Sequence, residues 1–329
     1  MFIGIYLDPF DYIPTVKFNK DFNREAELKK IILTTILSIL LKDEKPFYLP
    51  AARVFYPVFY EYIFRYEKER LAELSKKMMD MLASKHMLDE KDIIMYKSRY
   101  TEPMDALINK IFKLNEGVTE TSPNNGNFHK ELEEIIGGKI VLARKEGMAP
   151  AEFYLMMKNY YHLEMYLSSS SVNQLTTLYL FFKYWMENYL IIDEPEENLH
   201  PENQISLLNL LVKFSKNNKV LITSHSPLLT KALNNHIYLG ILKENNVNIE
   251  KTVEQHDIDI DLSSSLNHED IGIYFFDGGY IHNYKVKNYG VLFDDFKKVE
   301  RKLENISEIL TDEIYYLESE GASFIYARK

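Results

Sequence analysis

The segment LIIDEPEENLHP, residues 190–201, constrains the fold of this chain more than any other stretch. An apolar run at 189–192 leads directly into two adjacent carboxylates, Asp193 and Glu194. A strand without polar alternation is typical of a central strand in a parallel sheet, which is buried on both faces. The acids then follow its carboxyl end, the edge at which α/β folds bind ligands.

The segments after this strand repeat the alternation of strand and helix. A helix is expected at 202–215, a strand at 219–224 and a helix at 227–234. Such alternation indicates parallel strands joined by crossover helices. We therefore predict an α/β fold with a mainly parallel sheet flanked by helices. Further expected elements are strands at 1–7, 135–142 and 151–157, a helix at 24–42, a hairpin at 271–287 and a terminal helix at 294–310.

A change in composition marks a separate region between residues 58 and 128. The stretch from 58 to 115 is rich in Lys, Glu, Met and Leu and has no glycine before Gly117, and a polar loop at 116–127 follows it. This pattern predicts a helical lobe at 58–128, inserted into a core formed by 1–57 and 129–329.

Composition restricts the classes of function. The chain has no cysteine, which excludes disulfides and thiolate metal sites and fits a reducing cytoplasm. The N-terminus lacks the basic start and the long apolar stretch of a signal peptide. The longest apolar region, 31–41, covers only about half of a membrane span. We therefore expect a cytoplasmic protein without a membrane partner. The net charge of −10 argues against nucleic acid as a partner, although a local basic patch is compatible with it.

The two acids suit metal-assisted hydrolysis of a nucleotide. Asp193 would help hold Mg²⁺ at the phosphates, and Glu194 would orient or deprotonate the attacking water. The alternative is a strand end with two solvated acids.

Two further segments carry chemistry. LITSHSP (221–227) ends the next expected strand with His225, which could bind a γ-phosphate; alternatively it is a capping turn before a helix that begins with proline. LSSSSVNQ (167–174) opens a long helix with hydroxyl side chains, an arrangement that binds anions; plain N-capping would need only one serine.

The order along the chain, LSSSSVNQ, then LIIDEPEENLHP, then LITSHSP, resembles that of ABC-type ATPases. The closest resemblance is to the soluble branch termed AAA ATPases, which is related to OLD-like and SMC-like proteins. The resemblance implies that ATP and Mg²⁺ are the cofactors. It also implies a Walker B motif with Asp193 at the magnesium position and Glu194 at the catalytic position, and a switch histidine at His225. Segments 48–55 and 233–239 are also similar to parts of this branch.

The resemblance assigns the remaining site residues to contacts with a partner. In this family the signature segment of one subunit faces the nucleotide of the other, and here that segment holds Ser168, Ser169 and Ser170. Asn198 and His200 match the D-loop, which also lies near the partner subunit.

The sequence has no Walker A loop, the Gly-x-x-x-x-Gly-Lys-[Ser/Thr] motif that wraps phosphates. Its one Gly-Lys pair, Gly138 and Lys139, is followed by Ile140. The chain therefore resembles the C-terminal part of an ATPase, and shortening, gene splitting and loss of the loop all remain open.

Two functions from different classes follow. The first is an ATPase half-site that works as a homodimer or together with a Walker A-containing chain, with DNA repair or anti-phage defence as its implied role. The second is a non-catalytic scaffold that dimerises or docks an effector protein. Asp257, Asp259 and Asp261 could bind a metal, but a solvated strand edge is the favoured interpretation.

Overall fold

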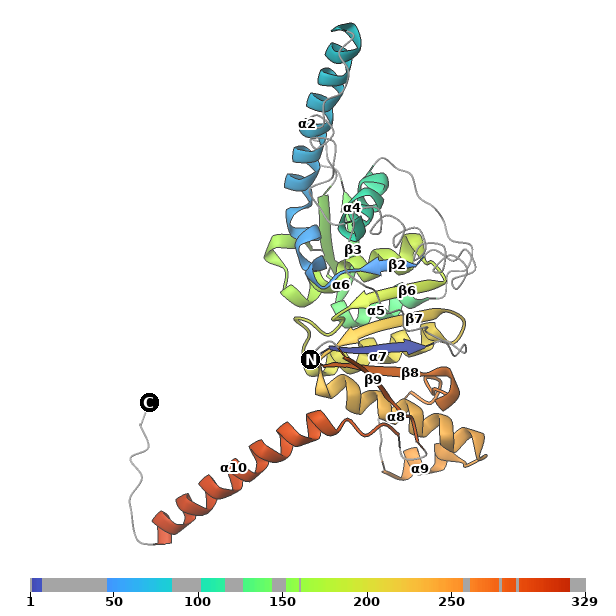
Figure 1. Ribbon diagram of the computed structural model, residues 1–329, viewed down its shortest axis with the longest axis vertical. Helices are drawn as coiled ribbons and strands as arrows, with labels where there is room; N and C mark the ends of the chain where they lie inside the picture. Colours follow the sequence, from blue (N-terminus) through green and yellow to red (C-terminus); the bar gives the residue numbers. More distant parts are fainter. Residues whose placement is uncertain are drawn as a thin grey trace, which may run out of the picture.

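The computed structural model describes residues 2–7, 46–84, 102–115, 127–143, 152–159, 161–256, 261–277, 280–287 and 290–319. Within them, six strands form one sheet in the order β2, β6, β7, β1, β8, β9 (Figure 1). The strands are β1 (Phe2–Leu7), β2 (Phe47–Leu49), β6 (Tyr189–Asp193), β7 (Lys219–Ser224), β8 (Gly272–Asp277) and β9 (Tyr280–Tyr284).

The half of the sheet that carries the two acids is parallel. Strand β6 pairs in parallel with β2 on one side and with β7 on the other, and Asp193 lies opposite Thr223. Helix α7 (Pro201–Ser215) makes the crossover between β6 and β7 and packs on β7. The predicted α/β fold, with parallel strands flanked by helices, is confirmed.

The other half of the same sheet is antiparallel. Strand β1 runs antiparallel to both β7 and β8, and β8 and β9 form the predicted hairpin. Only residues 278 and 279 separate β8 from β9, and so short a connection permits antiparallel pairing alone. The direction of β1 could not be predicted from an apolar run, because the side-chain pattern is the same for either direction.

The core lies against one face of the parallel strands. Leu190 and Ile192 of β6 are fully buried, as are Val220 and Ile222 of β7. On the opposite face of β6, Tyr189 is buried and Ile191 is partly buried. The expected burial is therefore complete on one face of the strand and partial on the other.

Helices surround the sheet, and two of them project from it. Figure 1 shows α2 extending from one side of the molecule and α10 from the other. The described helices include none that is both long and apolar enough to cross a membrane. The helices other than α7 are α2 (Phe55–Ser84), α4 (Glu102–Asn115), α5 (Phe128–Ile136), α6 (Ser170–Leu180), α8 (Pro227–Glu244), α9 (Ile249–His256) and α10 (Asp294–Ser319).

The predicted lobe at 58–128 contains most of α2 and all of α4. Its remaining segments lie outside the described residues, so its boundaries stay a prediction. The helix expected at 24–42 also lies outside them.

A second, smaller sheet leads into the serine-rich segment. Strands β3 (Gly138–Ala143), β4 (Glu152–Met157) and β5 (His162–Glu164) form an antiparallel meander. A short 3₁₀ helix, η2 (Met165–Leu167), follows β5 directly, and its Met165 is buried. This anchor fixes the point at which the serines begin.

Candidate functional site

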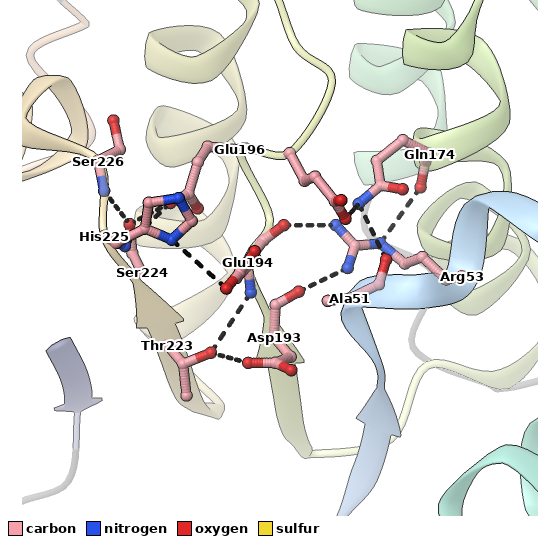
Figure 2. Close-up of polar contacts among 11 residues, drawn as sticks. Ala51, Arg53, Gln174, Asp193, Glu194, Glu196, Thr223, Ser224, His225 and Ser226 are labelled. Atoms are coloured by element: carbon pink, nitrogen blue, oxygen red, sulfur yellow. Dashed lines mark hydrogen bonds and ion pairs between the residues drawn. The ribbon is translucent and has the colours of Figure 1, made fainter. Parts of the chain in front are cut away.

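The carboxyl ends of β6 and β7 bring the two acids and the histidine to one edge of the sheet (Figure 2). The hydroxyl of Thr223 donates a hydrogen bond to Oδ1 of Asp193. Asp193 thus stays beside a hydroxyl group at the exposed end of a buried strand.

Glu194 turns the chain sharply away from the strand. Its φ of 43° lies in the left-handed region, which is uncommon for a residue with a side chain and clusters at functional sites. Its N–H donates to the carbonyl oxygen of Thr223 at 3.0 Å. Its carboxylate Oε1 lies 3.4 Å from Nδ1 of His225, so a base and an imidazole face the same space.

Glu196 ties the loop after β6 to the end of β7. Its Oε1 accepts hydrogen bonds from the hydroxyl of Ser224 at 2.5 Å and from the backbone N–H of His225 at 3.2 Å. The side chain is 6% exposed. Glu196 therefore fixes the backbone from which His225 projects, a role that the sequence did not indicate.

Arg53 is the main residue that the sequence analysis missed. It is 1% exposed and lies in the short 3₁₀ helix η1 (Ala51–Val54), within the segment 48–55. Its Nη1 donates to the carbonyl oxygen of Asp193 at 2.6 Å, and its Nη2 donates to that of Glu194 at 3.1 Å. Arg53 thus holds the backbone of both acids while leaving their carboxylates available.

The surroundings of Arg53 preserve its charge. Burial lowers its pKa to about 10, and the nearby carboxylates, that of Glu197 first, oppose this effect. A pKa of about 10 still leaves the guanidinium protonated at neutral pH. Asp193 also affects its other neighbour: burial and then the charge of Asp193 raise the pKa of Tyr48.

The serine-rich segment forms a second group. Ser169 is the N-cap of α6 and accepts a hydrogen bond from the N–H of Val172 at 3.3 Å. The hydroxyl of Ser168 donates to the carbonyl oxygen of Met165 at 2.7 Å, and Ser170 is exposed. One serine therefore caps the helix, as the plainer interpretation requires, and Ser170 faces solvent at the helix start.

Asn198 and His200 lie beside this second group. The hydroxyl of Ser171 donates to the carbonyl oxygen of Asn198 at 2.5 Å, and Asn198 has a left-handed φ of 60°. His200 is exposed and immediately precedes α7. The loop 194–200 thus runs from the acids to the serines.

Gln174 joins the two groups. Its carbonyl oxygen accepts from Nε of Arg53 at 3.3 Å, and its side-chain Nε2 donates to Glu197 Oε2 and to the carbonyl oxygen of Ala51, both at 3.4 Å. Gln174 is fully buried. The start of α6, η1 and the loop 194–200 are therefore held as one unit.

The described residues contain no group of three or more His, Cys, Asp or Glu side chains that could cage a metal ion. Mg²⁺ in phosphate-transfer sites is usually held by one or two protein carboxylates, with substrate phosphates and waters completing its shell. Asp193, with the hydroxyl of Thr223 beside it, fits that sparse donor set.

Asp257 and Asp259 lie outside the described residues. Asp261 does not lie on a solvated strand edge, because its carboxylate forms an ion pair with Nζ of Lys213 at 2.6 Å.

Comparison with known proteins gives one family. Residues 58–230, more than half of the chain, match a family model described as AAA ATPase domain. No curated protein matches. Among solved structures, the chain is similar to the SMC head domain from Thermotoga maritima, with 17% identity and a TM-score of 0.25. That match covers 38% of this chain and 44% of the head domain, so it spans less than half of either.

Proposed function

Because the chain belongs to the AAA ATPase domain family, we propose that it binds and hydrolyses ATP when a Walker A loop is supplied by a partner chain. The observation that carries the proposal is the convergence of Asp193, Glu194 and His225 at one sheet edge, on a backbone held by Arg53. An arrangement held by buried contacts is what phosphoryl transfer requires, because catalysis there is mostly positioning and charge stabilisation.

Each residue of the group has a distinct proposed role. Asp193 and the hydroxyl of Thr223 would hold Mg²⁺, which supplies positive charge next to the phosphates. Glu194 would orient the attacking water and accept its proton. His225, 3.4 Å from Glu194, would donate a hydrogen bond to the terminal phosphate.

The second group is proposed to act across a subunit interface. Ser168, Ser169 and Ser170 lie at the N-terminal end of α6, where unpaired N–H groups and the helix dipole favour an anion. The hydrogen bond between Ser171 and Asn198 keeps the loop 194–200 beside them. The resemblance supports a partner's nucleotide as that anion, in a homodimer or in an assembly with a Walker A-containing chain.

The first test is a calorimetric titration of the purified chain with Mg-ATP. Without a phosphate loop, Asp193 and Glu194 would face the triphosphate as uncompensated negative charge. We expect weak binding or none. Low-micromolar affinity would reveal another phosphate site and contradict this assignment.

The second test uses a chimera in which the Walker A strand, loop and helix of a family member precede this chain. Glu194→Gln in the chimera should lower ATP turnover by about 100-fold or more while ATP binding persists. Asp193→Ala should weaken Mg-ATP binding as well. Glu202→Gln is the matched control, because Glu202 is exposed on α7. Unchanged turnover in Glu194→Gln would refute the catalytic assignment.

The absence of a Walker A motif from the printed sequence favours one alternative, a non-catalytic scaffold that dimerises or docks an effector. If the chimera binds Mg-ATP but never hydrolyses it, the scaffold becomes the better interpretation. A role in DNA repair or anti-phage defence stays a prediction from the resemblance.

A further inference from the structure

Helix α10 exposes an apolar face along most of its length. The helix spans Asp294–Ser319, about 39 Å at 1.5 Å per residue, and extends away from the sheet (Figure 1). Large apolar side chains on it are between 44% and 65% exposed. They include Val299, Leu303, Ile306, Ile309, Leu310 and Ile314. An exposed apolar surface of this extent marks an interaction site.

The spacing of these residues identifies the kind of contact. Beginning at Phe296, apolar residues recur at 299, 303, 306 and 310, which alternates steps of three and four. That is a repeat of 3.5 residues, the spacing that lets two helices wrap around each other as a coiled coil. The partner of this face is therefore expected to be another helix with a similar apolar stripe.

The base of α10 is fixed to the body of the protein. Phe296 packs against the core and lies 6.4 Å, between ring centroids, from Phe293. Nζ of Lys231 on α8 forms an ion pair with Glu300 at 2.7 Å. The helix therefore leaves the body in a defined direction, and the apolar residues of its stripe after Phe296 are exposed.

Charge along α10 indicates which helix would cover that face. Residues 294–302 carry four basic residues, Lys297, Lys298, Arg301 and Lys302, and three acids, Asp294, Asp295 and Glu300, so their net charge is +1. From residue 303 to 319 there are five acids and no lysine or arginine: Glu304, Glu308, Asp312, Glu313 and Glu318. In a parallel pair, the five acids of both helices would lie together. In an antiparallel pair, the acidic part of each helix, with a net charge of −5 over 303–319, lies along the start of the other, with a net charge of +1 over 294–302.

We propose that α10 is a dimerisation helix that pairs antiparallel with α10 of a second copy of this chain. The same sequence supplies both the apolar stripe and the complementary charges, so no other protein is needed. This proposal does not rest on ATP binding or hydrolysis, and it can be tested without nucleotide.

The oligomeric state of the full chain is the first measurement. Sedimentation equilibrium should give twice the monomer mass of 38.8 kDa. The double variant Leu303→Asp, Leu310→Asp should raise the dissociation constant at least about 100-fold, because each dimer would bury four unpaired carboxylates. Both side chains are exposed in the single chain, so the fold should survive, as circular dichroism would verify. Asn305→Asp adds a charge to the polar side of the same helix and should leave the dimer intact.

The direction of pairing is the second measurement. Because the chain has no cysteine, single cysteines can be placed without background. In an antiparallel pair, Val299→Cys should not form a disulfide with itself, but it should do so when mixed with Leu310→Cys. A self-linked Val299→Cys dimer would refute the antiparallel arrangement. A monomer at every concentration, or a dimer insensitive to Leu303→Asp, Leu310→Asp, would refute the proposal as a whole.

Discussion

Replacing Arg53 by methionine, which keeps an unbranched apolar stem but removes the guanidinium, should strongly destabilise the protein. The guanidinium donates four hydrogen bonds to backbone carbonyl oxygens. The acceptors are those of Pro50, Gln174, Asp193 and Glu194. Each buried group left unpaired costs about 1–3 kcal/mol, although relaxation and the lower desolvation cost of methionine offset part of the sum.

The loss of the positive charge of Arg53 should also lower the free energy of unfolding. The carboxylates that surround the guanidinium, those of Asp193, Glu194, Glu196 and Glu197, would lose their shared cation. Removing one partner from a buried charge network typically costs 3–5 kcal/mol, so we expect about 3–5 kcal/mol for Arg53→Met. Arg53→Lys keeps a charge but cannot span four acceptors, so its loss should be intermediate.

Urea unfolding of the purified chain, followed by circular dichroism and extrapolated to water, measures this loss. Lys76→Met is the control, because Lys76 is exposed on α2 and its removal should change stability by less than about 0.5 kcal/mol. The loss for Arg53→Met should be present at neutral pH, well below the pKa of about 10. A loss below about 1 kcal/mol would refute the idea that Arg53 holds the two acids in place.

Two further predictions concern contacts elsewhere in the fold. Burial alone would raise the pKa of Asp261, but hydrogen bonds, that from Lys213 first, outweigh it and lower the pKa from 3.8 to about 2. The ionised carboxylate therefore stabilises the fold fully above pH 3.8. The difference in unfolding free energy between the unaltered protein and Asp261→Asn should shrink as the pH falls toward 2. A difference that does not change with pH in urea unfolding would contradict this. Gly240→Ala should cost about 1–3 kcal/mol, because its Cβ would lie 1.8 Å from the carbonyl oxygen of Leu266. Thermal unfolding measures that loss, and an unchanged melting temperature would show that the segment after residue 261 moves aside freely.

The sequence predicted those parts of the fold and site that depend on local pattern. Apolar runs that end in polar residues gave β6 and β7, and their parallel pairing explains why Asp193 and His225 share one edge. Helix α8 is longer than predicted, continuing to Glu244. At the predicted end, the side chain of Asn234 exchanges two hydrogen bonds with the backbone of Val291.

Arg53 could not have been found in the same way. Its partners at the end of β6 and just after it lie 140 and 141 residues further along the chain. They are backbone carbonyl groups, which every residue carries. The resemblance of segment 48–55 to the family marked this stretch, but no pattern of side chains indicates which carbonyl groups Arg53 contacts. The same applies to Gln174, whose amide and carbonyl bridge three separate segments.

The position of Arg53 also has a mechanical consequence. It lies at the root of α2, whose 30 residues extend about 45 Å. A rotation of about 5° at that root would displace the far tip by about 4 Å for an arm of this length. The guanidinium of Arg53 donates hydrogen bonds to the carbonyl groups of Asp193 and Glu194. A rotation of α2 about its first turn would therefore also move the backbone of these two acids. A force applied at the tip of α2 would reach the backbone of Asp193 and Glu194 as torque, and a sub-ångström shift of the loop would displace the tip by several times that distance.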